Sequence, residues 1–273
     1  VNIIPITTYI ENGFKLPGIE AFEKVKTPRT KAVLFSNPSN PTGTVYTREQ
    51  LVDLCKFCYD NDLYIISDEA YYEITQRDKI ITLLNLEGLD FDIRNHTIVI
   101  DSISKRFSAC GARVGAIISK NNNFMKQVLK FCQARLCAPY YGQVMGEAAL
   151  DFADEYLVEL SQEYQKRIDA TCEELSKNLK IKYHHSEGAF YIMVKLPIKD
   201  SDDFAVFLLK DFYSINPQTK EKETIMVAPA RGFYKTHNLG NDEIRIACVL
   251  EAEKMRRSVQ ILNEGLDVYL SKK

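Results

Sequence analysis

The feature that most constrains the fold is a series of four short apolar segments between residues 31 and 119. They are KAVLF, LYII, TIVI and GAII, and polar sequence separates each from the next. The segments are almost wholly apolar and do not alternate, which is typical of strands whose two faces are both covered by helices. Thr47 and Gln50 have the spacing of a capping box before an amphipathic stretch, which predicts a helix after the first strand. The pattern predicts an α/β sandwich with a mixed or largely parallel sheet.

The rest of the chain has a different pattern. Residues 121 to about 178 read mostly as helix, with a break near Ala138 and Pro139. Strand-like segments follow (IKYHHSE, GAFYIMVKL, TIMVAPA and DEIRIACV), with helices expected from about Ser201 and from Glu251. We therefore predict a partial large domain over residues 1–150 and a smaller α+β domain over residues 151–273.

Composition excludes several classes of partner. The 273 residues include 35 basic and 37 acidic side chains, and the net charge of −2 offers no field for nucleic acid or an anionic membrane. The apolar runs are too short to cross a bilayer. Seven scattered cysteines fit reduced thiols, so we expect a cytoplasmic protein. We expect no metal site. The expected partners are small molecules or other protein chains.

Two of the predicted strands end in polar residues. Ligands of open α/β sheets bind outside the carboxyl ends of the strands. SNPSNPTG, residues 36–43, predicts a stiff loop that presents Asn37 and Asn40, although an ordinary turn has the same composition. Asp68 and Glu69 end the next strand, where a carboxylate is costly unless it is paired or caps a helix. Tyr71 and Tyr72 follow, and either could offer a phenol to the same site or only pack.

A third strand leads into SISKRFSACGARVG, residues 102–115. Ser102 and Ser104 supply hydroxyls, Arg113 supplies a guanidinium suited to phosphate, and Lys105 supplies an amine. Together they indicate an anion site beside a nucleophile. Arg245 lies inside the apolar strand DEIRIACV, where its charge requires an anion, either an internal carboxylate or that of a substrate.

In this order the motifs resemble one family. NPxNPTG, then D-x-x-Y, then S-x-S-K with an arginine eight residues later, then a late R-I strand are similar to the class I and II aminotransferases, which use pyridoxal phosphate. The resemblance runs from about residue 1 to the C-terminus. It implies the fold type I architecture, here as a partial large-domain α/β/α sandwich followed by the smaller C-terminal domain.

The resemblance also implies a role for each residue. Lys105 would bind pyridoxal phosphate covalently and later move a proton, and Asp68 would hydrogen-bond the pyridine nitrogen. Tyr71 and Asn40 would bond the ring's phenolic oxygen. The phosphate would be held by Ser102, Ser104 and Arg113. Arg245, with Asn40 beside it, would bind the substrate carboxylate, and Gly188–Tyr191 would border the substrate.

The activity implied is transamination from aspartate or a similar common amino acid to a 2-oxo acid such as 2-oxoglutarate. Two alternatives remain: another pyridoxal-phosphate enzyme of the same fold (a β-lyase or synthase), or the aminotransferase-like effector domain of a transcription regulator. Members of the family carry well over a hundred residues before the stretch that resembles residues 1–18. We therefore expect an N-terminally truncated chain, a fragment that can be inactive by itself, and a homodimer for the full-length protein.

Overall fold

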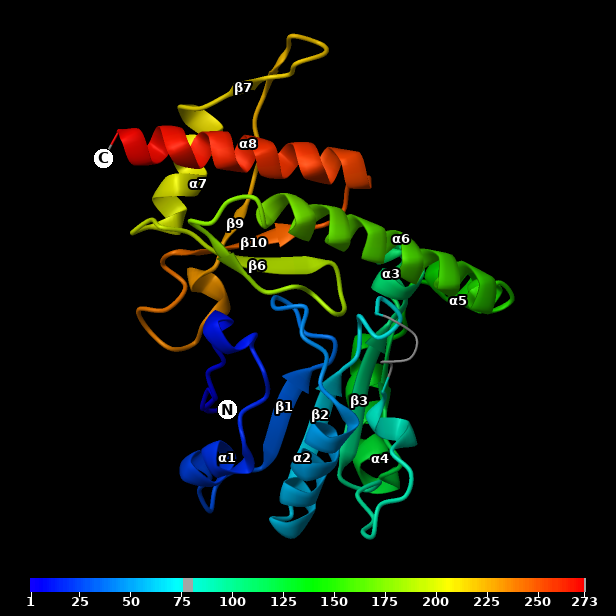
Figure 1. Ribbon diagram of the computed structural model, residues 1–273. Coiled ribbons are helices and arrows are strands. Elements are labelled where there is room, and N and C mark those ends of the chain that lie inside the picture. Colours follow the sequence, from blue (N-terminus) through cyan, green and yellow to red (C-terminus); the bar gives the residue numbers. More distant parts are fainter. Residues whose placement is uncertain (76–80, 273) are drawn as a thin grey trace.

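The computed structural model describes residues 1–75 and 81–272 (Figure 1). Its first sheet has the order β1-β2-β3-β4, in which β1, β2 and β3 are parallel and β4 is antiparallel to β3. The strands are Ala32–Ser36, Tyr64–Asp68, Thr97–Ser102 and Gly115–Ile118. The predicted α/β architecture with a mixed, largely parallel sheet is therefore confirmed.

One face of this sheet packs against helix α2 (Arg48–Asp60). Thr47 begins the helix with the predicted capping box, since its side chain accepts from the backbone N–H of Gln50 and the Gln50 side chain accepts in return. The apolar side of α2 enters a core with Ile65 of β2 and Val99 of β3. Helix α1 (Ile19–Val25) adds Phe22 to the same core. The helix and its register thus follow directly from sequence periodicity.

The expectation that helices cover both faces is wrong for part of this sheet. Strand β4 is exposed along its whole length, and Leu34 of β1 is 69% exposed. Helix α4 (Asn122–Arg135) approaches the sheet where Phe124 lies 6.0 Å from the ring of Tyr64, but none of the residues of α4 is buried. The described elements are too few to cover the apolar surface that the sequence places in these strands.

Two further helices lead to the second part of the chain. Helix α5 spans Tyr140–Leu150 and the long helix α6 spans Ala153–Leu175, so the predicted break before Pro139 is confirmed. Figure 1 shows α6 in green, running from the end of α5 across the small sheet. Several large side chains on α4, α5 and the turns beside them are exposed: Leu129, Phe131, Leu136, Tyr140, Tyr141, Leu150 and Phe152.

The second sheet has the order β5-β6-β10-β9, and all its pairs are antiparallel. The strands are Lys182–Tyr183, Tyr191–Lys195, Glu243–Ala247 and Ala228–Pro229. Helices α7 (Ser201–Lys210) and α8 (Ala252–Ser271) join α6 over it, with Phe204, Leu208 and Leu262 in the core. A short hairpin of β7 (Ser214–Ile215) and β8 (Lys222–Glu223) replaces part of the loop expected at 216–223.

The prediction of a strand over TIMVAPA is wrong for most of that segment. Only Ala228 and Pro229 pair with β10. Upstream, the hydroxyl of Thr224 donates to the carbonyl oxygen of Leu208 at the end of α7, and Met226 is 82% exposed. The segment before Ala228 is therefore held at the end of α7 and does not continue the strand pairing with β10.

The two main apolar clusters come from different parts of the chain. One extends from Phe22 to Val99, and the other from Ile168 to Tyr269. A smaller cluster joins Ile10 and Phe14, near the start of the chain, to Met193 of β6 and to Ala230. Domain boundaries at residue 150 stay a prediction.

Candidate active site

The carboxyl ends of the three parallel strands meet at one edge of the first sheet. Ser36 of β1 is in register with Asp68 of β2, and Asp68 is in register with Ile100 of β3. The chain leaves this edge through three loops. The backbone N–H of Asn37 donates to the carbonyl oxygen of Asp68 (3.0 Å), and that of Glu69 donates to Ile100 (2.8 Å). The predicted strand-end residues therefore start from adjacent positions.

The loop after β1 uses its two asparagines differently. Asn37 is 2% exposed, and its Oδ1 accepts from the backbone N–H of Tyr46 (2.9 Å), so it holds its own loop together. Asn40 lies on the surface, where its Oδ1 accepts from Nη1 of Arg245 (2.8 Å). The prediction that the loop presents both residues is therefore wrong for Asn37.

Close backbone contacts bring the segment before β6 against this edge. A Cβ on Gly188 would lie 2.7 Å from Pro38, and one on Gly43, whose φ is +71°, would lie 2.1 Å from Oγ of Ser186. The backbone N–H of Ala189 donates to the carbonyl oxygen of Ile74 after β2 (2.7 Å). Glycine is required at both positions because a side chain would separate the two segments. The residues that follow, Phe190 and Tyr191, are consequently placed at the strand ends.

Lys105 projects over aromatic rings from both parts of the chain. It belongs to the short helix α3 (Ile103–Arg106), which Ser102 begins by accepting from the N–H of Ser104. The Nζ atom of Lys105 lies 5.8 Å from the ring centroid of Tyr71 and 5.5 Å from that of Phe190. Aromatic faces attract a cationic amine while excluding water from one side of it.

Tyr71 is the residue through which the predicted groups meet. Its hydroxyl lies 2.9 Å from that of Tyr191, and both side chains are buried. Burial raises the pKa of Tyr71 far above its ordinary value, and the nearby charges of Arg245 and Asp68 act on that pKa in opposite directions. The phenol thus stays protonated and can donate a hydrogen bond.

Arg245 of β10 packs against two aromatic rings. Its guanidinium carbon lies 4.1 Å from the ring centroid of Tyr191 and 4.7 Å from that of Phe233. With Nη1 bonded to Asn40, the Nε atom is buried and finds no hydrogen-bond partner among the described residues. The alternative of an internal salt bridge is absent from the described contacts, and a buried donor without a partner favours an anionic ligand.

Asp68 and Glu69 have separate roles. Oδ1 of Asp68 accepts from the N–H of Ala70 (3.1 Å), so the carboxylate orders its own loop and its other oxygen makes no bond to a described residue. Glu69 is 4% exposed and accepts from the N–H of Leu83 (3.1 Å), and burial raises the pKa of its carboxyl. Glu69 is a structural residue.

The three residues predicted to hold phosphate are only partly brought together. Oγ of Ser102 lies 2.9 Å from Oγ of Ser104 at the start of α3. Arg113 is exposed, has a left-handed backbone (φ 56°), and donates through Nη1 to the carbonyl oxygen of Cys110 (3.0 Å). This bond ties Arg113 to its own loop. The phosphate role of all three stays a prediction.

Sequence reasoning did not single out the aromatic residues around the site. Phe190 and Tyr191 were expected only to border the substrate, and Phe233 was not noticed. The one available signal was the glycine of GAFY, because a glycine before a buried aromatic pair marks a close backbone approach.

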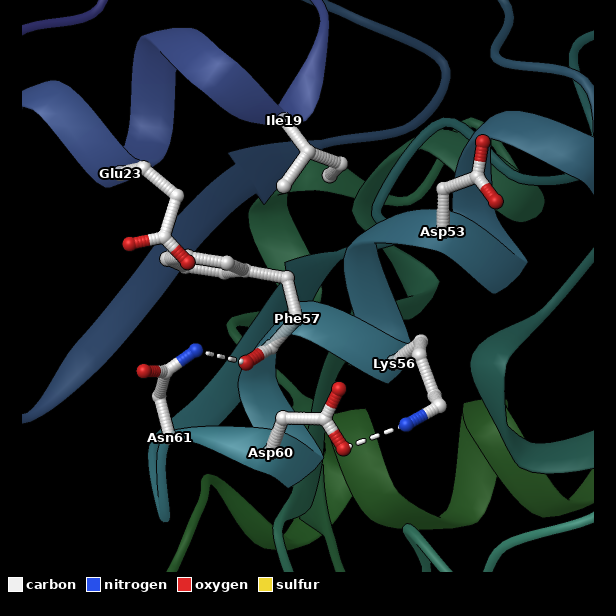
Figure 2. A pocket seen from close by; sticks show the side chains of 7 residues that line it. All are labelled: Ile19, Glu23, Asp53, Lys56, Phe57, Asp60 and Asn61. Carbon is white, nitrogen blue, oxygen red and sulfur yellow. Dashed lines mark hydrogen bonds and ion pairs between the residues drawn. The ribbon is translucent and has the colours of Figure 1, made fainter.

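Two hollows among the described residues lie elsewhere. One, of about 360 Å³, lies between α1 and α2, where the side chains of Lys56 and Asp60 pair with each other and Asn61 donates to Phe57 (Figure 2). The other, of about 530 Å³, is lined by residues of the loop 231–241. Lys105 lines neither of them.

The described residues form neither a metal-binding cluster nor a membrane-spanning helix. Between residues 1 and 75 and between 81 and 272, no group of three or more His, Cys, Asp or Glu side chains could hold a metal ion. None of the described helices has the length and apolar character that crossing a membrane requires.

Cys55 and Cys58 are buried in α2, and burial raises the pKa of each thiol to about 12.

An amine and a phenol thus lie at the carboxyl ends of the parallel strands of the first sheet, and Arg245 of the second sheet reaches the same edge. The family model for aminotransferase class I and II matches residues 1–262, and the chain belongs to this family.

Several known proteins are similar to this chain in sequence or in fold. A putative aminotransferase of Bacillus subtilis, YugH, is 31% identical over 210 residues, which cover 76% of this chain and 52% of the relative. A probable aspartate/prephenate aminotransferase of Aquifex aeolicus is 28% identical, with 94% of this chain and 62% of the relative covered. The crystal structure of an aspartate aminotransferase from Thermotoga maritima superposes with a TM-score of 0.78 at 27% identity, covering 95% of this chain and 62% of the other. The chain thus spans between half and two thirds of the length of these relatives.

Proposed function

We propose that the protein is a pyridoxal-phosphate-dependent aminotransferase that moves the amino group of aspartate or a similar amino acid to a 2-oxo acid such as 2-oxoglutarate. The observation that carries this proposal is the buried Nε atom of Arg245, which lacks a partner among the described residues beside the same aromatic cluster that holds Lys105. A substrate carboxylate supplies the acceptor that this guanidinium lacks.

The residues present fit the cofactor. The site offers an amine at Lys105, a carboxylate at Asp68, a protonated phenol at Tyr71 and hydroxyls at Ser102 and Ser104. When bound, pyridoxal phosphate supplies an aldehyde that condenses with amines and a ring that accepts an electron pair. These are the donor and acceptor types that its aldehyde, ring nitrogen, ring oxygen and phosphate require.

Each residue has a distinct task in this proposal. The guanidinium of Arg245 binds and orients the α-carboxylate, with Asn40 fixing one edge of the fork. Tyr71 donates a hydrogen bond at the edge of the cofactor site, and Asp68 would accept a hydrogen bond from the protonated ring nitrogen of the bound cofactor. The amine of Lys105 moves the proton of the substrate's α-carbon. The rings of Tyr71 and Phe190 exclude water from one side of that amine.

We also propose that the whole protein is a cytoplasmic homodimer. The exposed apolar side chains of α4 and α5, with the open edge strand β4, form more apolar surface than a free-standing molecule tolerates. The seven cysteines are all free thiols, which fits a reducing compartment. Sedimentation of the whole protein tests the dimer, and a monomer at micromolar concentration contradicts it.

Borohydride labelling tests the activity proposal. The protein is incubated with pyridoxal phosphate, reduced, digested and mapped by mass spectrometry. We expect the reduced adduct on Lys105 and its loss in Lys105→Arg. An adduct on Lys120 or Lys126 overturns the assignment. Amine transfer from a panel of amino acids to 2-oxoglutarate then identifies the donor, and elimination without transfer identifies a β-lyase.

A further inference from the structure

Tyr191, which the family resemblance places only at the border of the substrate, contacts two of the groups assigned above. Its hydroxyl lies 2.9 Å from that of Tyr71, and its ring lies 4.1 Å from the guanidinium carbon of Arg245. The side chain is 7% exposed, and its ring lies 4.6 Å from that of Phe190. One rigid side chain therefore connects the carboxylate-binding arginine to the phenol beside Lys105.

The ring of Tyr191 determines how Arg245 is held. A guanidinium stacked on an aromatic face can slide or rotate in plane unless its edges are fixed. The ring of Phe233 also lies near the guanidinium carbon (4.7 Å), and Asn40 accepts from Nη1. With two rings against the guanidinium and Nη1 bonded, Nε is a buried donor that has no partner among the described residues and is left for a ligand. Without the Tyr191 ring, the guanidinium loses the nearer of its two aromatic contacts.

The hydroxyl of Tyr191 determines where the hydrogen of Tyr71 points. Two phenols 2.9 Å apart share one hydrogen bond, so one donates and the other accepts. If Tyr71 donates to Tyr191, its hydrogen is used. If Tyr191 donates, Tyr71 keeps its own hydrogen for another acceptor. Burial raises the pKa of Tyr71, so the hydrogen is present throughout the neutral range.

We propose that Tyr191 is a positioning residue that couples substrate binding to the cofactor site. Its ring fixes Arg245 for the carboxylate, and its hydroxyl donates to Tyr71 so that the Tyr71 hydrogen is directed at the cofactor's ring oxygen. This inference rests on the proposed function, and its ring half is tested independently of cofactor.

The ring half is tested on cofactor-free protein by the Nε–H resonance of Arg245 in arginine-labelled samples, assigned with Arg245→Lys. Tyr191→Phe keeps the ring, so we expect the resonance to stay in place. Tyr191→Leu removes the ring, so we expect the resonance to shift and exchange faster with water. Tyr183→Phe, a tyrosine of the neighbouring strand β5, is the control. An unchanged Arg245 resonance in Tyr191→Leu overturns this half.

The hydroxyl half is tested on protein loaded with pyridoxal phosphate, by the pH midpoint of the bound cofactor's absorbance change. Tyr191→Phe loses one hydrogen bond to Tyr71, so we expect the midpoint to rise by up to about one pH unit, with Tyr183→Phe unchanged. The affinity for 2-oxoglutarate stays within about twofold in Tyr191→Phe and falls about fivefold in Tyr191→Leu. An unchanged midpoint in Tyr191→Phe overturns this half.

The two proposals fail in different ways. If borohydride leaves Lys105 unlabelled in unaltered protein, the proposed function fails, whereas the Arg245 resonance still decides the ring half. If Lys105 is labelled and both Tyr191 variants behave like Tyr183→Phe, the proposed function stands and the role of Tyr191 is wrong.

Discussion

Nη1 of Arg245 donates to Oδ1 of Asn40 over 2.8 Å, although 205 positions separate the two residues in the chain. The bond joins β10 of the second sheet to the loop after β1 of the first. A second bond joins the same two parts of the chain, because Oγ1 of Thr75 donates to the carbonyl oxygen of Glu187 (2.7 Å). The guanidinium of Arg245 is thereby located relative to the strand ends of the other sheet.

Removing this arginine should weaken carboxylate binding without releasing cofactor. Arg245→Ala should lower the affinity for 2-oxoglutarate by a factor of at least about thirty, because truncating one partner of a desolvated charge pair costs about 2 kcal/mol or more. Calorimetric titration checks this. Arg231→Ala, an exposed arginine of the same domain that pairs with Asp200, is the control. Loss of pyridoxal phosphate from Arg245→Ala contradicts the assigned role.

Arg106 links the loop after β2 to the end of β3. Its Nη1 bonds Glu73 (3.1 Å) and its Nη2 bonds Asp101 (2.6 Å), and all three side chains are less than a quarter exposed. Arg106→Ala removes the cation that bridges two partly buried carboxylates, so we expect a loss of about 1–3 kcal/mol in the free energy of unfolding.

Denaturant unfolding checks the Arg106 prediction. Arg94→Ala removes a pair with Asp92 whose side chains are 72% and 52% exposed, and should lower the free energy of unfolding much less than Arg106→Ala, because water screens an exposed pair. Equal losses in the two variants would show that burial of the Arg106 bridge adds nothing.

Glu69 should make stability depend on pH. Burial raises the pKa of the Glu69 carboxyl in the folded state. The contribution of Glu69 to the free energy of unfolding is therefore fully present below the unfolded-state pKa of about 4.3, and it is lost as the pH rises through the folded-state pKa. Glu69→Gln keeps an oxygen for the Leu83 N–H and cannot ionise. We therefore expect the variant to gain stability relative to the unaltered protein between pH 4 and pH 8.

Urea unfolding at intervals of one pH unit measures the Glu69 effect. Glu155→Gln, at an exposed position of α6, gives the baseline. A stability difference for Glu69→Gln that stays constant over this range shows that the carboxyl does not ionise differently in the folded protein.

The second core should be sensitive to lost volume at Leu208. This residue of α7 is fully buried among Phe204, Leu262 and their neighbours, so Leu208→Ala should cost about 2–5 kcal/mol. Val206→Ala, on the same helix but 48% exposed, should cost less than about 1 kcal/mol. Thermal or urea unfolding compares them. Similar costs would mean that the core relaxes around the cavity.

Local sequence determined the elements and their order. The capping box at Thr47, the break at Pro139 and the apolar strands of the first sheet all appear where the pattern predicts them. Capping, proline geometry and side-chain periodicity involve neighbours within a few residues, so they can be read along the chain. The order of polar residues at the strand ends was likewise enough to indicate the family.

Tertiary structure decided which side chains meet. Asn37 and Asn40 look equivalent in SNPSNPTG. The side chain of Asn37, however, is buried and accepts from the backbone N–H of Tyr46, whereas the side chain of Asn40 accepts from Arg245. The pairing of Tyr71 with Tyr191 spans 120 positions and depends on how closely Gly188 approaches Pro38. Such contacts are set by the packing of one sheet against another, and no periodicity within either segment encodes them.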